Sequence, residues 1–353
     1  MPGNNRCTTN MSKIKHPDIQ QDLANASSAL CNYIERRAAP KTCINVVKLF
    51  KRFTADVVMR VSFEHSNEID YESNSNTVLD LLILLTEKIY DPKFVWFQYI
   101  PLLRPVALML DRLTTNYRGR VVKLAEHSLQ DRTVRTSLPR LKHKLLDAYD
   151  QQRLTDKELI GNTSFFLAAA WDTTAQTLTA LMWLLAKHPN EQIRLRDDIV
   201  RDGPQSKYLE YCIKETLRLY PPALTARELS TDIEWNGMRL RKGMMLTANV
   251  FTLHRSVKYW GHDSDLFRPE RFVPEHCKHF HKSQFFAFGM GPRNCVGGKL
   301  AMCQMQILVS RILVNYEIEL CPSSPELLDV YTPMLFVPMI KGPVELNFIK
   351  RAL

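Results

Sequence analysis

The chain has 353 residues, of which 45% are hydrophobic and 24% are charged. This composition is typical of a globular protein with a large core, folded as one large domain or two fused ones. The formal net charge of +10 would suit nucleic acid, an anionic membrane face or an acidic protein partner. Because no Lys/Arg-dense run with interleaved aromatic residues occurs, we expect no nucleic acid partner and favour a basic docking face for a protein.

The eight cysteines are scattered along the chain and form no C-x-x-C pair. This pattern predicts reduced intracellular thiols rather than a disulfide framework, with most of the cysteines acting as small buried hydrophobes. No apolar run reaches the length of about 20 residues that spans a bilayer, and the polar N-terminus lacks a signal-peptide pattern. The sequence as given therefore predicts no membrane anchor.

The first third of the chain is predicted to be helical, with loops between the helices. Apolar residues recur at helical spacing, and clusters of polar residues or prolines interrupt them. The predicted segments are a helix over 45–58, a polar loop over 64–76, a helix over 78–90, a stretch punctuated by Pro92, Pro101 and Pro105, and a basic helix over 107–131.

The longest predicted helix begins at Thr155. Thr155 and Glu158 form a capping box, in which each side chain accepts a hydrogen bond from the backbone of the other residue. Pro189 ends the pattern after His188. Since the sequence is apolar on nearly every side from Phe165 to Leu185, we expect this helix to be buried through the middle of the molecule.

The remaining segments combine helices with short strands. Prolines end the shorter helices, and Asn-Gly and Lys-Gly pairs indicate tight turns between strands. The predicted segments are helices over 190–202 and 207–219, short strands from Glu228 to Leu253, a mostly irregular stretch over 254–294, a long helix over 297–315, and strands at the end of the chain. The sequence thus predicts a mainly α protein with small β-sheets.

Cys295 lies in a glycine-rich loop directly before the last long helix. Glycines let a backbone approach a flat ligand closely, and a helix N-terminus is expected to lower the pKa of the thiol. Backbone N–H groups in such a loop can donate to the sulfur. A thiolate ligand pushes electron density onto a haem iron, and Arg293 could meet an anionic group such as a haem carboxylate.

This loop resembles the haem-binding signature of the cytochrome P450 family at every fixed position, namely Phe288, Gly291, Arg293, Cys295 and Gly297. The resemblance implies a cytochrome P450 fold, mainly α with small β-sheets, and haem b (iron protoporphyrin IX) as the cofactor. It also implies that Cys295 is the axial ligand of the iron. On the residues alone, the alternative is an ordinary glycine-rich loop with a buried cysteine.

Glu215 and Arg218 stand three residues apart on one predicted helix face. Taken alone they would form an ordinary exposed pair. Together with Arg271 of a Pro-Glu-Arg-Phe segment, they resemble the family's Glu-x-x-Arg helix and the segment that locks it. The resemblance implies that these three residues form a structural cluster behind the haem loop.

Asp172 and Thr173 are polar residues in the middle of the apolar helix. Their burial without partners would cost several kcal/mol, and a threonine can bond back to the carbonyl one turn earlier and bend the helix. The segment resembles the family's oxygen-activation motif, in which an acid and a threonine relay protons, with Ala170 where many members have glycine. The alternative is a satisfied helix–helix contact.

Further residues are assigned only by the same resemblance. Arg227 stands where members often pair a basic residue with a haem propionate; the alternative is a surface arginine. The run from His276 to His281 is read as a solvated loop rather than a zinc site. The residues implied to line the substrate cavity, with core packing as the alternative, are Phe165, Phe166, Ala169, Ala223, Leu224, Thr225 and Leu335.

The resemblance extends from about residue 45 to the C-terminus, so we interpret residues 1–353 as a single P450-like domain that is incomplete at its N-terminus. It implies a monooxygenase that inserts one oxygen atom from O₂ into a lipophilic substrate. Electrons would come from a flavoprotein reductase at the endoplasmic reticulum membrane, or from a ferredoxin in the mitochondrion. The alternatives are a haem-binding pseudoenzyme or truncated inactive copy, a haem-thiolate isomerase or dehydratase, and a chain that does not fold alone.

Overall fold

The chain is mainly helical with small antiparallel sheets, as the sequence predicts. A computed structural model describes residues 16–38, 42–66, 69–73, 78–83, 117–130, 140–222, 225–278, 281–331 and 338–351. The predicted proline-punctuated stretch and parts of the helices predicted over 78–90 and 107–131 lie outside these ranges. Within them, residues 78–83 are helical and one further helix covers Tyr117–Ser128.

The α-helices in the described ranges are α1 (Pro17–Arg37), α2 (Val46–Phe63), α6 (Tyr117–Ser128), α7 (Leu141–Asp150), α8 (Asp156–Lys187), α9 (Pro189–Asp202), α10 (Lys207–Leu219), α11 (Val250–Arg255), α12 (Val257–Trp260), α13 (Pro274–Cys277) and α14 (Gly298–Asn315). The strands are β1 (Cys43–Asn45), β2 (Thr225–Glu228), β3 (Ile233–Trp235), β4 (Met238–Leu240), β5 (Met245–Ala248), β6 (Tyr316–Leu320), β7 (Val330–Tyr331), β8 (Met339–Ile340) and β9 (Glu345–Lys350).

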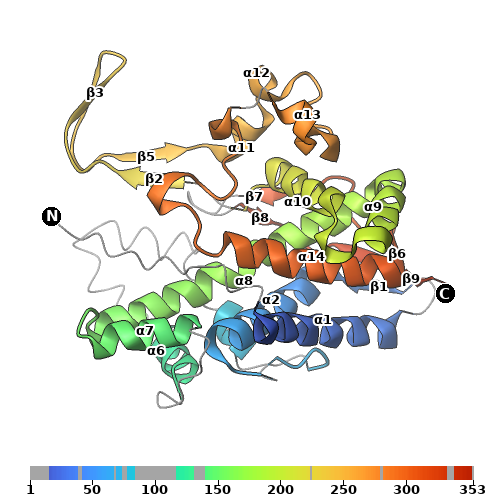
Figure 1. Cartoon of the computed structure of the whole chain (residues 1–353), viewed down its shortest axis with the longest axis horizontal. Coiled ribbons are helices and arrows are strands. Elements are labelled where there is room, and N and C mark those ends of the chain that lie inside the picture. Colours follow the sequence, from blue (N-terminus) through green and yellow to red (C-terminus); the bar gives the residue numbers. More distant parts are fainter. Residues whose placement is uncertain are drawn as a thin grey trace.

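Helix α8 crosses the molecule and begins where the sequence predicts (Figure 1). The backbone N–H of Thr155 donates to Glu158 Oε2 at 2.9 Å, and the backbone N–H of Glu158 donates to Thr155 Oγ1 at 3.3 Å. The prediction of burial from Phe165 onward is wrong, because Phe165 is 66% exposed and continuous burial begins only at Thr174. The N-terminal turns of α8 contact α6 and α7, and one side of these turns stays open to solvent.

The largest group of buried apolar side chains lies where α14 meets α1 on one side and α9 and α10 on the other (Figure 1). Helix α2 packs along α8 beneath them. The fully buried aromatic side chains Phe50 and Phe53 of α2 and Trp183 of α8 belong to this core. The packing fixes α14, and therefore the loop that precedes it, against α8.

Short strands connect distant parts of the chain. The three-stranded sheet has the order β1–β9–β6, with every pair antiparallel. Strands β2 and β5 pair with each other, and β3 and β4 form a hairpin around Asn236 and Gly237, whose φ angles of 50° and 75° suit a tight two-residue turn. The prediction of strands as far as Leu253 is wrong, because Asn249 caps α11 by accepting the N–H of Thr252 at 3.1 Å.

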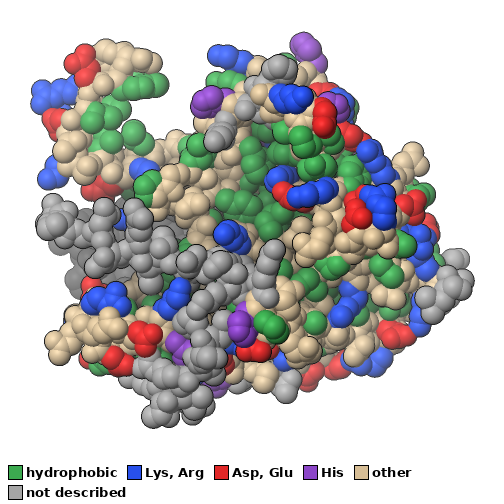
Figure 2. Space-filling view, viewed as in Figure 1, with side chains coloured by type: hydrophobic (Ala, Val, Ile, Leu, Met, Phe, Trp, Pro, Cys, Tyr) green, Lys and Arg blue, Asp and Glu red, His purple; other side chains and the backbone are tan. Residues whose placement is uncertain are grey.

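The β3–β4 hairpin is the most exposed part of the described sheets. Ile233, Trp235 and Met238 are among its exposed apolar side chains. In the space-filling view the hairpin forms a lobe at the upper left that carries both hydrophobic and charged side chains (Figure 2).

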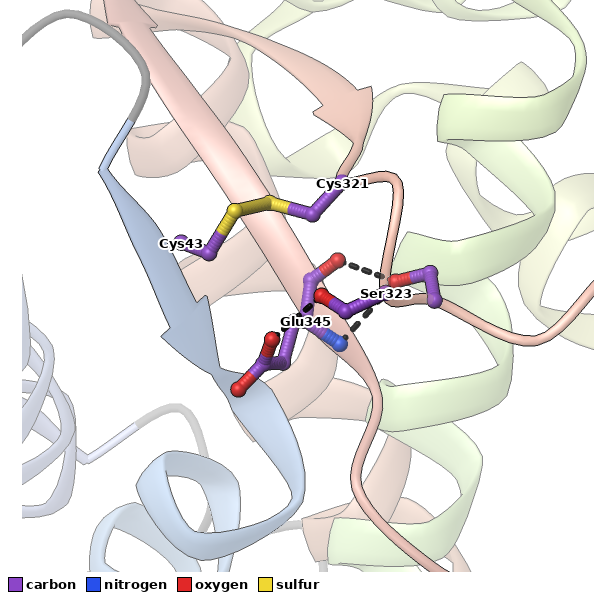
Figure 3. Close-up of a disulfide and its surroundings, with 5 residues drawn as sticks. Cys43, Cys321, Ser323 and Glu345 are labelled. Atoms are coloured by element: carbon purple, nitrogen blue, oxygen red, sulfur yellow. Dashed lines mark hydrogen bonds between the residues drawn. A yellow bond between two sulfur atoms is a disulfide. The ribbon is translucent and has the colours of Figure 1, made fainter.

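A disulfide joins Cys43 to Cys321, so the prediction that the cysteines are all reduced thiols is wrong (Figure 3). The two residues are 278 positions apart, and their Cα atoms are 6.1 Å apart. Cys43 lies in β1, and Cys321 directly follows β6, so the bond passes over the central strand β9. Beside it, Ser323 Oγ donates to Glu345 Oε2 at 2.5 Å. Sheet pairing brings these cysteines together, and their spacing in sequence gives no sign of it.

Among the described helices, none combines the length and the hydropathy that crossing a membrane requires.

Candidate functional site

Backbone hydrogen bonds shape the loop that carries Cys295. The N–H of Cys295 donates to the carbonyl of Phe288 at 2.7 Å, and the N–H of Asn294 donates to the carbonyl of Gly291 at 3.1 Å. Gly289 and Gly291 have φ angles of 70° and 73°, in the left-handed region that glycine adopts without steric cost. The loop thus turns back on itself and places Cys295 just ahead of α14.

The Cys295 residue is exposed, and its sulfur faces two backbone donors. Protein atoms crowded around the sulfur raise the pKa of the thiol, although the N–H groups of Gly297 and Gly298 act in the opposite direction. The sequence-based expectation of a lowered pKa is therefore wrong for the protein alone, because this desolvation exceeds the effect of the amides. A bound metal ion deprotonates a coordinating thiol outright, and the two amides can then stabilise the thiolate.

Two glycines allow close contacts around the sulfur. A Cβ atom added to Gly297 would lie 3.9 Å from Cys295 Sγ. A Cβ atom added to Gly298 would lie 3.2 Å from Cδ1 of Phe288, which is closer than side chains normally pack. Phe288 therefore lies directly against the start of α14, and any larger residue at position 298 would require its ring to shift.

Two arginines from separate segments meet beside the loop. Arg293 ends the 3₁₀ turn Gly291–Arg293, and Arg227 lies in β2. Arg227 Nη2 donates to the carbonyl of Arg293 at 3.1 Å, and both residues are exposed. The structure thus brings the Arg227 side chain to the backbone of Arg293, the other residue for which the sequence suggests a propionate-binding role.

Glu215, Arg218 and Arg271 form a buried network. Arg218 holds Glu215 through two parallel bonds, Nε to Oε2 and Nη2 to Oε1, each of 2.8 Å. Arg271 Nε donates to Glu215 Oε1 at 3.2 Å. Arg218 Nη1 also donates to the carbonyls of His254 at 2.7 Å and Ser264 at 2.5 Å. Glu215 and Arg218 are fully buried, so the exposed-pair alternative is wrong.

Asp172 and Thr173 face different surroundings. Asp172 is 1% exposed, and its Oδ1 lies 3.1 Å from Nζ of Lys51 on α2, while its Oδ2 is buried without a hydrogen-bond partner. Thr173 is half-buried and its Oγ1 donates to the carbonyl of Ala169 at 3.0 Å. The backbone contact of Thr173 is the one that the sequence suggests, whereas Asp172 lies in a helix–helix contact.

Lys51 is the partner that reasoning from the sequence missed. It lies 121 positions before Asp172, and its Nζ is also 5.4 Å from the centre of the Trp171 ring. A lysine inside an apolar helix pattern is a weak signal, because long lysine side chains usually reach solvent. Only the packing of α2 against α8 identifies its partner.

The residues implied to line a cavity differ in their exposure, and some lie outside the described ranges. Ala223, Leu224 and Leu335 lie outside the described residues. Phe165 and Ala169 are exposed on α8, so the core-packing alternative is wrong for these two. Phe166 packs against the small apolar cluster around Leu145 and Leu159, and Thr225 is half-buried in β2.

No cluster of metal-binding side chains occurs in the part of the chain that the structure describes. His276 and Cys277 end α13, and His279 of the same run lies outside the described residues. The interpretation of this run as a loop is therefore wrong for His276 and Cys277, which belong to a short helix.

Comparison with known proteins agrees with this geometry. The model of the family "Cytochrome P450" matches residues 4–347. The chain is 27% identical to "Cytochrome P450 3A18" of Rattus norvegicus over 91% of its own length and 69% of the relative's. It is 29% identical to "Cytochrome P450 3A12" of Canis lupus familiaris over 83% of this chain and 62% of the relative. A shorter match, 38% identical over 47% of this chain and 34% of the relative, is to "Putative cytochrome P450 CYP13A6" of Caenorhabditis elegans.

The chain belongs to the cytochrome P450 family, the haem-thiolate monooxygenases. It spans between 62% and 69% of the length of the first relatives above.

The residues around Cys295 fit the haem of this family. A haem iron in this class takes a thiolate ligand, and the loop presents an exposed cysteine residue whose sulfur faces two amide donors. The Arg227 guanidinium lies against the loop backbone at Arg293, and both arginines are exposed, so they could bind carboxylates as charged donors.

Proposed function

We propose that this chain binds haem b through the thiolate of Cys295 and acts as a monooxygenase on a lipophilic substrate. The observation that carries the proposal is the position of Cys295, an exposed residue directly before α14 whose sulfur faces the N–H groups of Gly297 and Gly298. These donors would hold the ligand as an anion and limit how strongly it donates to the iron.

Bound haem would supply the iron at which O₂ is activated. The chain's own residues would bind, orient and shield it. Arg293 and Arg227 would hold the propionates as fixed cations. Gly291 and Gly297 would keep the loop flat and close to the ring, and Phe288 would pack beside the sulfur.

Protons would reach the site from α8. Thr173 is half-buried, and its hydroxyl is oriented by the carbonyl of Ala169. It would hold a proton or a water molecule at its Oγ1. Asp172 would supply protons to it only after its side chain turns away from Lys51, because the carboxylate is paired on the α2 side.

The partners follow from the family and from charge. The electron donor would be a flavoprotein reductase at the endoplasmic reticulum membrane, with a mitochondrial ferredoxin as the second choice. The formal net charge of +10 suits an acidic donor of either kind. Exposed apolar residues such as Phe165 and Ala169 on α8, with Phe166 and Thr225, would contribute to a lipophilic cavity together with Ala223, Leu224 and Leu335.

The direct test is the absorption spectrum of the reduced protein with carbon monoxide bound, measured beside Cys295→Ser. Thiolate-ligated haem gives a strongly red-shifted band, which we expect from the wild type and not from the variant. A matched control is Cys277→Ser, whose cysteine is not disulfide-bonded and lies at the end of α13. If the wild type and Cys295→Ser give the same spectrum, the ligand assignment is wrong.

A haem-binding protein without turnover is the second candidate. The observation that favours it is that Asp172 is paired with Lys51 of α2, while the Thr173 hydroxyl bonds to the backbone of its own helix. Such a protein would show the thiolate–haem band but form no product with a reductase and NADPH. Product formed in step with NADPH consumption would exclude this candidate.

A further inference from the structure

His254 is a fully buried histidine that contacts the segment leading into the Cys295 loop. It lies on α11, and its Nε2 accepts the backbone N–H of Phe286 at 2.8 Å. Its ring stacks on the ring of Phe285, with 5.4 Å between the ring centres and 11° between the planes. The edge of Trp260 completes the aromatic surroundings, with the ring centres 6.2 Å apart.

The backbone of the same residue is held by the buried ion network. Arg218 Nη1 donates to the carbonyl of His254 at 2.7 Å, and Arg218 is itself held by Glu215. His254 therefore bonds to the network through its carbonyl and to the loop segment through its ring. Figure 1 shows α11 close to α10, the helix from which Arg218 comes.

The Phe286 backbone is fixed at both ends and leads directly to the cysteine. Its N–H is bound by His254, and its carbonyl accepts the N–H of Gly289 at 3.0 Å. Two residues further on, the carbonyl of Phe288 accepts the N–H of Cys295. A continuous series of hydrogen bonds and short peptide segments thus runs from Arg218 to Cys295.

Nε2 can accept a hydrogen bond only while the imidazole is neutral. Burial lowers the pKa of His254 to about 4, and the nearby Arg218 guanidinium contributes to this shift. At neutral pH the ring proton then resides on Nδ1, which faces the carbonyls of Leu217 and Arg218 without a well-aligned hydrogen bond to either.

We infer that His254 is a positioning residue that fixes the Cys295 loop to the Glu215–Arg218–Arg271 network. Its neutral ring accepts the Phe286 N–H and supports the Phe285 ring, and so sets the path of the chain toward Cys295. The consequence for haem ligation rests on the proposed function, whereas the consequence for the loop itself does not.

Hydrogen exchange tests the contact without any cofactor. In the wild-type protein the amide of Phe286 should exchange slowly, because its only acceptor in the structure is buried. In His254→Phe, which keeps an aromatic ring for stacking but lacks an acceptor, this amide should exchange about 10-fold faster, as expected for the loss of one hydrogen bond. His254→Gln, whose Oε1 can reach a similar position, should restore most of the protection.

A matched control is available on another face of the molecule. His188 also lies against a phenylalanine ring, that of Phe267, and its ring also bonds to the backbone, through Nδ1 and the carbonyl of Leu184. His188→Phe should leave the exchange of the Phe286 amide unchanged. Rapid exchange of this amide in the wild type would overturn the inference even if His254→Phe failed to fold.

A spectroscopic measurement connects the contact to the ligand. The spectrum is recorded with haem bound and the iron reduced under carbon monoxide. In His254→Phe, the fraction of haem that gives the strongly red-shifted thiolate band should fall at least 2-fold, which corresponds to a change of less than about 1 kcal/mol in ligation. In His254→Gln this fraction should remain near that of the wild type. An unchanged fraction in His254→Phe would overturn the inference. If the wild type lacks the band altogether, the proposed function fails, and the exchange experiment alone still decides whether His254 positions the loop.

Discussion

The buried ion network and the Cys295 loop lie at the two ends of one series of contacts, yet they are stabilised in different ways. Glu215 and Arg218 are fully buried, and their charged atoms are bonded to each other and to backbone carbonyls. The loop from Gly291 to Val296 is exposed, and glycine conformations and backbone hydrogen bonds set its shape. The comparison indicates that charge pairing holds the buried network, whereas backbone conformation holds the exposed loop that carries Cys295.

The largest effect is expected from breaking the network. Glu215→Ala leaves Arg218 and Arg271 buried without their carboxylate, which should lower the free energy of unfolding by about 3–5 kcal/mol. Lys207→Ala removes an exposed charge of the same helix, whose partner Glu210 is three residues away, and should cost at most about 1 kcal/mol. Urea denaturation measures both. Equal effects in the two variants would show that the network is no more important than a surface pair.

Removal of the disulfide should have the second largest effect on stability. Cys43 and Cys321 close a loop that spans 278 positions in sequence, so removing the bond releases much chain entropy in the unfolded state. Cys43→Ser should lower the free energy of unfolding by about 2–4 kcal/mol. The matched control is Cys277→Ser, since that cysteine is not disulfide-bonded. A reductant that leaves the melting temperature of the wild type unchanged would argue against the bond.

Acid should weaken the contact between the buried ion network and the Cys295 loop. The pKa of His254 is lowered to about 4 in the folded protein, below its value in the unfolded chain, and Arg218 and Arg255 are the cations near its ring. Its contribution to stability is therefore complete above the unfolded pKa of about 6.5 and is lost as pH falls toward 4. The loss should reach about 2–3 kcal/mol.

Comparing the wild type with His254→Gln isolates this contribution from that of the carboxylates, which titrate in both proteins. Relative to His254→Gln, the wild type should lose about 2–3 kcal/mol of stability between pH 6.5 and pH 4, because only the wild type carries the titrating imidazole. A difference that stays constant over this range would show that His254 does not titrate as a buried neutral group.

The smallest effect is expected at the α2–α8 contact. Lys51→Met removes the cation beside the buried Asp172 carboxylate and should cost about 1–2 kcal/mol, because the side chain of Lys51 is partly exposed. Adding Asp172→Asn removes the uncompensated charge and should recover most of the loss. Thermal unfolding of the two single variants and the double variant measures the coupling. Strictly additive losses would mean that the pair does not interact.

Local sequence patterns predicted the features that depend on neighbouring residues. The capping box of Thr155 and Glu158 is confirmed, as is the mainly α fold with small sheets. The spacing of Glu215 and Arg218 marks one helix face, and the glycines around Cys295 mark a turn before a helix. Each of these features depends on a few neighbouring residues, and in a helix or turn their spacing determines which side chains lie on the same face.

Features that depend on contacts between distant segments could not be predicted in this way. The Cys43–Cys321 bond, the Lys51–Asp172 pair and the bond from Phe286 to His254 join residues that are 32 to 278 positions apart. The position at which α8 becomes buried also depends on which helices pack against it, since Phe165 is exposed and Trp171 is buried. Only the folded arrangement of the helices determines these contacts.

The central claim is that the sulfur of Cys295 is bonded to a haem iron. X-ray absorption at the iron edge of the haem-loaded protein tests it most directly, because a sulfur neighbour scatters differently from the porphyrin nitrogens. We expect a sulfur neighbour in the wild type and in Cys277→Ser, and none in Cys295→Ser. Iron that keeps a sulfur neighbour in Cys295→Ser, or has none in the wild type, would contradict the account.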